Sequence, residues 1–87
     1  MKFEIWSKDA CKYCVLAKTL LKNKNYEFFE FIITDNEITQ NQKRVTVDEL
    51  KLNFPQARTM PQIEMIDDTG VKTYIGGYTE LEKFLTN

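Results

Sequence analysis

Two cysteines, Cys11 and Cys14, are the residues of this chain best suited to chemistry, because they stand three positions apart in the segment Cys11-Lys12-Tyr13-Cys14. On a helix, residues three apart lie on one face, and two thiols so placed come within reach of a disulfide. A crosslink across so short a loop stabilises a fold by only about 2 kcal/mol in the chain-entropy model. We therefore interpret the pair as a reactive dithiol rather than a structural staple.

The two thiols are expected to have different roles. Cys11 stands where a predicted strand gives way to a predicted helix, and unpaired amides and the helix dipole at such a place favour the thiolate over the thiol. Lys8 and Lys12 add positive charge nearby, whereas Asp9 opposes them. Cys14, one turn further along, should be more shielded. In thiol–disulfide exchange, Cys11 would attack a disulfide and Cys14 would resolve the mixed disulfide.

Other interpretations of the cysteines remain open. A C-x-x-C segment is also half of a zinc site, and paired cysteines can be inert core residues. Tetrahedral zinc needs four ligands, and the chain offers two thiols and no histidine, which disfavours a metal site within one chain. The lack of histidine also excludes a Ser-His-Asp triad and a Cys-His pair.

The elements that must position the cysteines form a βαβ unit. Alternating residues predict a first strand over 2–6, and an apolar stripe predicts an amphipathic helix over 12–23. Residues 26–33 are aromatic and β-branched on both alternations, as expected of a strand in the middle of a sheet and covered on both faces. The two strands should run parallel, which makes the fold class α/β.

The rest of the chain predicts two further helices and a hairpin. Residues 34–44 are polar and are expected to form a loop, in which Lys43 and Arg44 either dock a partner or, more simply, are solvated. Thr46-Val47-Asp48-Glu49 is a capping box that should open a helix over 47–54. Strands over 62–66 and 71–75 should pair antiparallel. A second capping box, Thr79-Glu80-Leu81-Glu82, should begin a last helix whose inward-facing residues are Leu81, Phe84 and Leu85. Trp6 and the phenylalanines at 28, 29 and 31 are assigned to packing.

Composition narrows the function further. The chain has 87 residues, so we expect one domain, without repeats or linkers. Its 12 basic and 13 acidic side chains nearly cancel, which gives no reason to expect nucleic acid or an anionic membrane as partner. No apolar run approaches the ~18 residues that a spanning helix needs, and we expect a cytoplasmic protein.

Three separated segments resemble the glutaredoxins of the thioredoxin superfamily, and the resemblance runs along nearly the whole chain. They are Lys8-Asp9-Ala10-Cys11-Lys12-Tyr13-Cys14 with Val15-Leu16-Ala17-Lys18, similar to the active-site helix; Thr59-Met60-Pro61-Gln62-Ile63, similar to the Thr-Val-Pro segment; and Ile75-Gly76-Gly77-Tyr78-Thr79-Glu80, similar to the Gly-Gly segment. The short length, the Thr-Met-Pro variant and the long polar segment are most similar to glutaredoxins of large tailed bacteriophages. The resemblance implies a thioredoxin fold over residues 1–87, β-α-β-α-β-β-α, with a four-stranded mixed sheet flanked by three helices.

The resemblance also implies roles for site residues. Cys11 becomes the nucleophile and Cys14 the resolving thiol, and bound glutathione lies beside Lys8, Tyr13, Thr59, Met60, Pro61, Gly77, Tyr78 and Thr79. The ammonium of Lys8 suits the glycine carboxylate of glutathione, and the ring of Tyr13 can cover the disulfide. The plainer alternatives are a solvated lysine and a surface aromatic.

Two of these implied features concern the backbone. The Met60–Pro61 bond is expected to be cis, which would turn the Met60 N–H and C=O toward an extended peptide; the alternative is a proline that merely begins a strand. Gly76-Gly77, followed by Tyr78-Thr79, should form a close-approach turn that delivers the amides of the last helix to the γ-glutamyl carboxylate. The alternative is a plain turn with Thr79 as the cap.

The function implied by the resemblance is reduction of protein disulfides and glutathione mixed disulfides by a monomeric enzyme recharged by glutathione, with ribonucleotide reductase a usual client. Lys12 stands where most dithiol glutaredoxins have proline, and its charge should make the protein somewhat more oxidising. Three alternatives stay open: a thioredoxin-like donor recharged by thioredoxin reductase, a carrier of a [2Fe–2S] cluster held between two protomers by Cys11 and glutathione, and a noncatalytic interaction domain.

Overall fold

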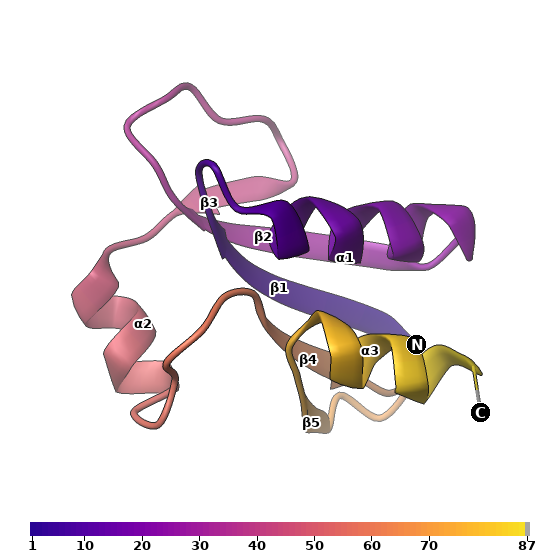
Figure 1. The fold of residues 1–87 in the computed structure, drawn as a ribbon. Coiled ribbons are helices and arrows are strands. Elements are labelled where there is room, and N and C mark those ends of the chain that lie inside the picture. The colour runs from indigo at the N-terminus through magenta and orange to yellow at the C-terminus, as the bar shows by residue number, and fades with distance from the viewer. Residues whose placement is uncertain (87) are drawn as a thin grey trace.

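A five-stranded mixed sheet organises the chain, and the computed structural model describes residues 1–86 of it. The elements are β1 (Lys2–Lys8), α1 (Lys12–Asn23), β2 (Glu27–Ile33), β3 (Gln42–Arg44), α2 (Val47–Asn53), β4 (Gln62–Ile66), β5 (Lys72–Gly76) and α3 (Tyr78–Thr86). Figure 1 shows α1 and α3 side by side in front of the sheet, with α2 standing apart from them. The predicted order of strands and helices is confirmed, with β3 added.

The sheet differs from the prediction in its centre and in one edge. Its order is β3-β2-β1-β4-β5, so β1 is the middle strand and β2 lies beside it. The prediction that residues 26–33 form the middle was wrong, because β4 pairs antiparallel with the other side of β1. The predicted loop over 34–44 also ends in β3, which pairs parallel with β2 and makes five strands rather than four. Polar residues suit such an exposed edge.

Two apolar clusters cover the two faces of the sheet. Neighbouring residues of a strand point to opposite faces, so Ile5 and Trp6 of β1 enter different clusters. The cluster under α1 and α3 consists of Phe3, Ile5, Ala17, Leu21, Ile63 and Leu81, all almost fully buried. The other consists of Trp6, Val45 and Phe54, with Leu50 of α2 among the residues packed against it. Trp6 stacks on Phe31 with ring centroids 4.7 Å apart, which confirms its packing role.

The structure confirms one of the two predicted capping boxes and contradicts the other. At α2, the Glu49 amide donates to the Thr46 hydroxyl and the Thr46 amide donates to the Glu49 carboxylate, both at 3.1 Å, as predicted. The box expected at Thr79 was wrong, because α3 begins one residue earlier. The Gly77 amide donates to Glu80 Oε1 at 2.8 Å, so Gly77 takes the capping position.

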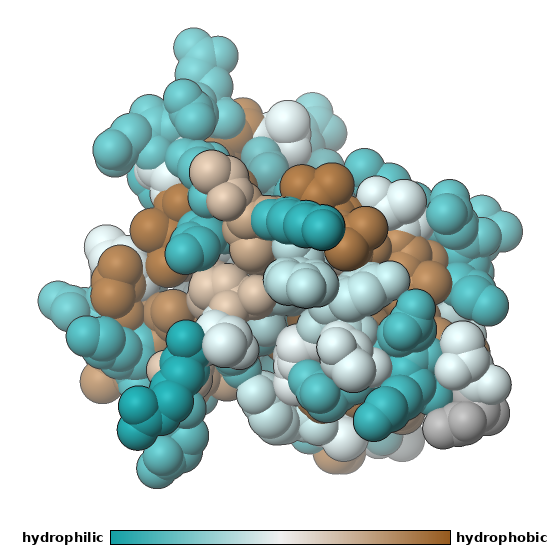
Figure 2. Space-filling model, in the orientation of Figure 1, coloured by the Kyte–Doolittle hydropathy of each residue, from teal (hydrophilic) through white to brown (hydrophobic). Residues whose placement is uncertain are grey.

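The face of the molecule seen in Figure 2 mixes apolar and polar side chains and is not divided into large patches of either kind. Figure 2 shows brown apolar residues over α1 and toward α2, separated by white and teal ones. Val15 on α1 and Leu52 on α2 are among the exposed apolar side chains. Phe84 was expected to face inward but is 39% exposed, because it lies at the border of the cluster, with its ring edge-on to Phe3.

Candidate active site

The two cysteines form a disulfide at the start of α1, just after the central strand ends. Their Cα atoms are 5.2 Å apart, which confirms the predicted reach of the two sulfurs. Cys11 is the residue that caps α1, with an extended backbone, and its Sγ accepts a hydrogen bond from the Cys14 amide at 3.2 Å. The first turn of α1 contains no acidic residue. A sulfur anion at Cys11 would therefore face helix amides without a carboxylate in that turn.

The two cysteines differ in how far they are exposed to solvent. Cys14 is 1% exposed, whereas Cys11 is only half-buried. The expected shielding of Cys14 is confirmed. A disulfide-bearing substrate can approach only a sulfur that solvent also reaches, so this geometry suits Cys11 for attack from outside and Cys14 for attack within the protein.

The segment before β4 lines one hollow together with Tyr13, the residue before Cys14, and is supported by a buried glutamine. The Met60–Pro61 bond is cis, as the resemblance implied. The side-chain amide of Gln62 donates to the Thr59 carbonyl at 2.6 Å, and its oxygen accepts from the Tyr74 hydroxyl. Gln62 is 3% exposed. Sequence reasoning missed this support, because nothing in an alternating strand pattern marks a glutamine as buried.

A shallow hollow of about 180 Å³ brings together most of the residues predicted to bind glutathione. It is lined by Tyr13, Thr59, Met60, Gly77, Tyr78, Thr79 and Glu80, and we call it the Tyr13–Tyr78 groove. The rings of Tyr13 and Tyr78 are 6.1 Å apart, centre to centre, across it. A Cβ atom at Gly77 would lie 3.5 Å from the Pro61 carbonyl, so the chain approaches the cis-proline segment closely there. The predicted close-approach turn is confirmed.

Comparison with known protein families and solved structures shows what this chain is similar to. The sequence model of the glutaredoxin family matches residues 3–71, most of the chain. The chain belongs to the glutaredoxin family. Among solved structures, it is similar to glutaredoxin 1 from Francisella tularensis, crystallised with cacodylate, with 26% identity, a TM-score of 0.62 and coverage of 99% of this chain and 98% of that one. No curated protein sequence matches the chain.

A second solved structure supports the fold. The solution structure of glutaredoxin from Brucella melitensis is 24% identical, with a TM-score of 0.66, and covers 99% of this chain and 79% of that one. The thioredoxin-like α/β fold with three helices and a mixed sheet is therefore established for this glutaredoxin. In the part of the chain that the structure describes, no helix is long and apolar enough to cross a membrane.

The two charged residues that precede Cys11 differ in their contacts. Lys8, the last residue of β1, is exposed and is not one of the residues that line the Tyr13–Tyr78 groove. Asp9 instead turns toward the polar segment after β2, where its Oδ2 accepts from the Thr34 hydroxyl at 2.6 Å. Arg44, expected either to dock a partner or to be solvated, is exposed, and its Nε also donates to the Thr34 carbonyl at 3.0 Å. The sequence carried no signal for these contacts between distant segments.

A buried carboxylate under α1 was also missed. Glu30 of β2 accepts hydrogen bonds from Lys18 Nζ at 2.9 Å, from Gln42 Nε2 at 2.8 Å and from the Ser7 hydroxyl. Burial by itself raises the pKa of Glu30, but these hydrogen bonds and the Lys18 charge outweigh burial and lower the pKa below its usual 4.5. The ionised carboxylate thus joins α1 to the sheet one turn beyond Cys14.

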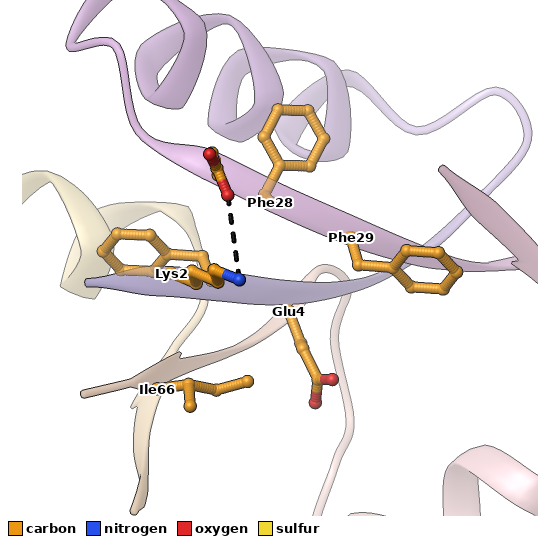
Figure 3. Close-up of a pocket in the computed structure, with 7 residues that line it drawn as sticks. Lys2, Glu4, Phe28, Phe29 and Ile66 are labelled. Carbon is orange, nitrogen blue, oxygen red and sulfur yellow. Dashed lines mark ion pairs between the residues drawn. The ribbon is translucent and has the colours of Figure 1, made fainter. Parts of the chain in front are cut away.

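Another hollow, of about 280 Å³, lies at the opposite end of the sheet. Figure 3 shows it around Lys2, Glu4, Phe28, Phe29 and Ile66, with a dashed line for the ion pair of Lys2 with Glu27 at 3.9 Å. Lys2, Glu4, Phe28 and Phe29 lie near the starts of β1 and β2, and Ile66 ends the antiparallel strand β4. Cys11 follows the other end of β1. The hollow has no thiol in its lining and is not part of the dithiol site.

Proposed function

We propose that this glutaredoxin is a glutathione-dependent dithiol oxidoreductase. The Cys11 thiolate attacks one sulfur of a protein disulfide or of a glutathione mixed disulfide, and the other sulfur leaves as a thiolate that takes up a proton. Cys14 then attacks the Cys11 sulfur, which releases the substrate as a thiol and leaves the Cys11–Cys14 disulfide. Two glutathione molecules reduce that disulfide and leave as oxidised glutathione. The observation that carries the proposal is the disulfide between a half-buried Cys11 and a buried Cys14.

The Tyr13–Tyr78 groove is the proposed place for glutathione. The first amides of a helix have no partner within it, so those of Tyr78 and Thr79 are suited to the γ-glutamyl carboxylate. The adjacent Glu80 carboxylate suits the ammonium at the same end of glutathione. The backbone of Met60, beside Thr59 and Pro61, would pair with the backbone of the glutathione cysteine.

The other end of glutathione carries a second carboxylate, which needs a cation. The residues that line the groove within 1–86 include no lysine or arginine. We assign this role to Lys8, whose flexible stem is exposed at the end of β1, while the Tyr13 ring, 53% exposed, covers the bound disulfide. We extend the proposal to a monomer that acts in the cytoplasm and supplies electrons to ribonucleotide reductase; the motif resemblance supports this extension.

The test compares wild type, Cys11→Ser and Cys14→Ser in the glutathione-coupled reduction of a small mixed disulfide, with glutathione reductase present. We expect Cys11→Ser to be inactive, because no nucleophile remains, and Cys14→Ser to retain activity, because glutathione itself can resolve the mixed disulfide. Inactivity of all three proteins would overturn the proposal. Turnover with thioredoxin reductase alone would then favour a thioredoxin-like donor, and a cluster-bridged dimer after anaerobic reconstitution would favour a carrier.

A further inference from the structure

We propose that Asp9 and Thr34 are positioning residues that hold the loop carrying Cys11 in its reactive place. The inference rests on the thiol–disulfide exchange proposed above. It assigns a task to the polar segment after β2, which neither the dithiol nor the Tyr13–Tyr78 groove uses. The contact that carries it is the hydrogen bond of 2.6 Å from the Thr34 hydroxyl to Asp9 Oδ2.

The loop between β1 and α1 needs an external support. Only three residues, 9–11, join the strand to the helix. Ala10 among them has a φ of 52°, in the left-handed region that side chains rarely adopt. Cys11 follows directly, so the direction of its side chain depends on keeping Ala10 in this conformation. A loop with such a residue relaxes when nothing holds its neighbours.

Asp9 provides that support by reaching across to a segment 25 residues away. Its Oδ2 accepts from Thr34 and also from the side-chain amide of Asn36 at 3.3 Å. Thr34 is 9% exposed, so the contact is shielded from water on that side. Hydrogen bonds to a carboxylate are stronger than those between neutral groups, which makes this contact able to hold a strained loop.

The segment that receives Asp9 is itself fixed. The Thr34 hydroxyl accepts the Asn36 amide at 3.0 Å, which closes a local turn. Arg44 of β3 donates to the carbonyls of Thr34 and Asn36, and β3 is paired with β2. The chain of contacts therefore runs from the sheet edge through Thr34 to the residue two positions before Cys11. This connection gives Asp9 a task two positions before Cys11, because its carboxylate accepts hydrogen bonds from donors of another segment.

The position of these contacts makes a specific kinetic prediction. Asp9 and Thr34 line a different hollow, with Arg44 and Thr46, and none of its residues lines the Tyr13–Tyr78 groove. Loss of the hydrogen bond should displace the reacting sulfur and leave the proposed glutathione site intact, because Lys8, the one proposed contact next to Asp9, is held in β1 by its pairing with Ile33 of β2. The rate of reaction should fall while the Michaelis constant for the glutathione mixed disulfide stays the same.

The test is Thr34→Val, which removes the hydroxyl and keeps the shape of the side chain. We expect kcat to fall about fivefold, with KM changed by less than about twofold. Thr34→Ser, which restores the hydroxyl, should have the wild-type kcat. Asp35→Asn removes an exposed charge one residue away and serves as the matched control, with kcat unchanged. Thermal unfolding of each variant shows that it is folded at the assay temperature.

A second measurement separates this inference from the proposed function. Alkylation of Cys11 by iodoacetamide, in reduced proteins that carry Cys14→Ser, needs no glutathione and should slow about fivefold with Thr34→Val. In a chain that carries Asp9→Ala, adding Thr34→Val should change that rate by less than about twofold, because the two residues act through one contact. Unchanged alkylation in Thr34→Val, or an equal loss in both backgrounds, would overturn the inference even if wild type reduces glutathione mixed disulfides.

Discussion

Replacement of Lys18 by methionine should destabilise the protein by breaking a buried ion pair. Lys18 lies on α1 and donates to Glu30 of β2 at 2.9 Å. The Glu30 side chain is only 4% exposed, whereas that of Lys18 is 25% exposed. Methionine keeps most of the length and apolar contact of the lysine stem. The change therefore removes the charge and its hydrogen bond and leaves the Glu30 carboxylate buried.

The size of the effect follows from the contacts that remain. Removal of one partner from a fully buried ion pair costs about 3–5 kcal/mol. Here Glu30 keeps its hydrogen bonds from Ser7 and Gln42, and part of the Lys18 charge already lies in water. The loss should be closer to that of one charge-assisted hydrogen bond, about 2 kcal/mol. In a domain of this size, that lowers the midpoint of thermal unfolding by about 8–16 °C.

The assay is thermal unfolding followed by circular dichroism at neutral pH, with the Cys11–Cys14 disulfide intact. Lys22→Met is the matched control, because Lys22 is an exposed lysine on the same helix, and its free energy of unfolding should change by about 0.5 kcal/mol or less. In a chain that carries Glu30→Gln, Lys18→Met should also cost less than about 0.5 kcal/mol. The reasoning is refuted if Lys18→Met is no less stable than Lys22→Met, or if its cost is the same with Gln at position 30.

The stability lost in Lys18→Met should also depend on pH, in a direction that the pKa of Glu30 fixes. The pKa of Glu30 is lowered in the folded protein, so its stabilising contribution is complete above the unfolded value near 4.5. The contribution is lost as the pH falls through the lower, folded pKa. Lys18→Met removes a group that lowers this pKa, so the pKa of Glu30 in the variant should rise. The stability difference between wild type and variant should therefore shrink as the pH falls from 7 to below 4.

Two further predictions concern the core and the redox potential. Leu21→Ala should cost about 2–5 kcal/mol in urea unfolding because Leu21 is 0% exposed, and Leu52→Ala should cost less than about 0.5 kcal/mol because Leu52 is 83% exposed; equal effects would contradict the assigned core. Lys12→Pro should lower the reduction potential measured against glutathione redox buffers, because it removes a cation beside the Cys11 thiolate at a helix position that tolerates proline. A higher potential in that variant would contradict the role given to Lys12.

Features that depend on neighbouring residues were predictable from the sequence. The helix at 12–23 was predicted with the bounds that the structure has, because its apolar spacing is a local pattern. The capping box at Thr46 was also correct, since both of its hydrogen bonds join residues three apart. The capping box predicted at Thr79 was wrong, because the last helix could begin after either Gly77 or Thr79. The turn at Gly76, with a φ of 118°, places the first helical residue at Tyr78.

Features that depend on distant partners were not predictable in the same way. Three polar residues, Gln42–Arg44, have no strand periodicity and become β3 only because the edge of β2 is available. Glu30 stands within a segment of apolar residues, and its burial is acceptable only because Ser7, Lys18 and Gln42 surround it. No spacing rule connects residues that are 12 or 23 positions apart.

The sequence by itself determined the dithiol, the elements on either side of it and the α/β class, because thiol spacing, periodicity and capping act over a few residues. Only the tertiary structure decided that β1 is the central strand, that the Asp9 carboxylate pairs with the Thr34 hydroxyl, and that Tyr13 and Tyr78 meet beside the cis-proline segment. These outcomes depend on which strand edges pair and which buried polar groups find partners, and those choices are made among segments far apart in the chain.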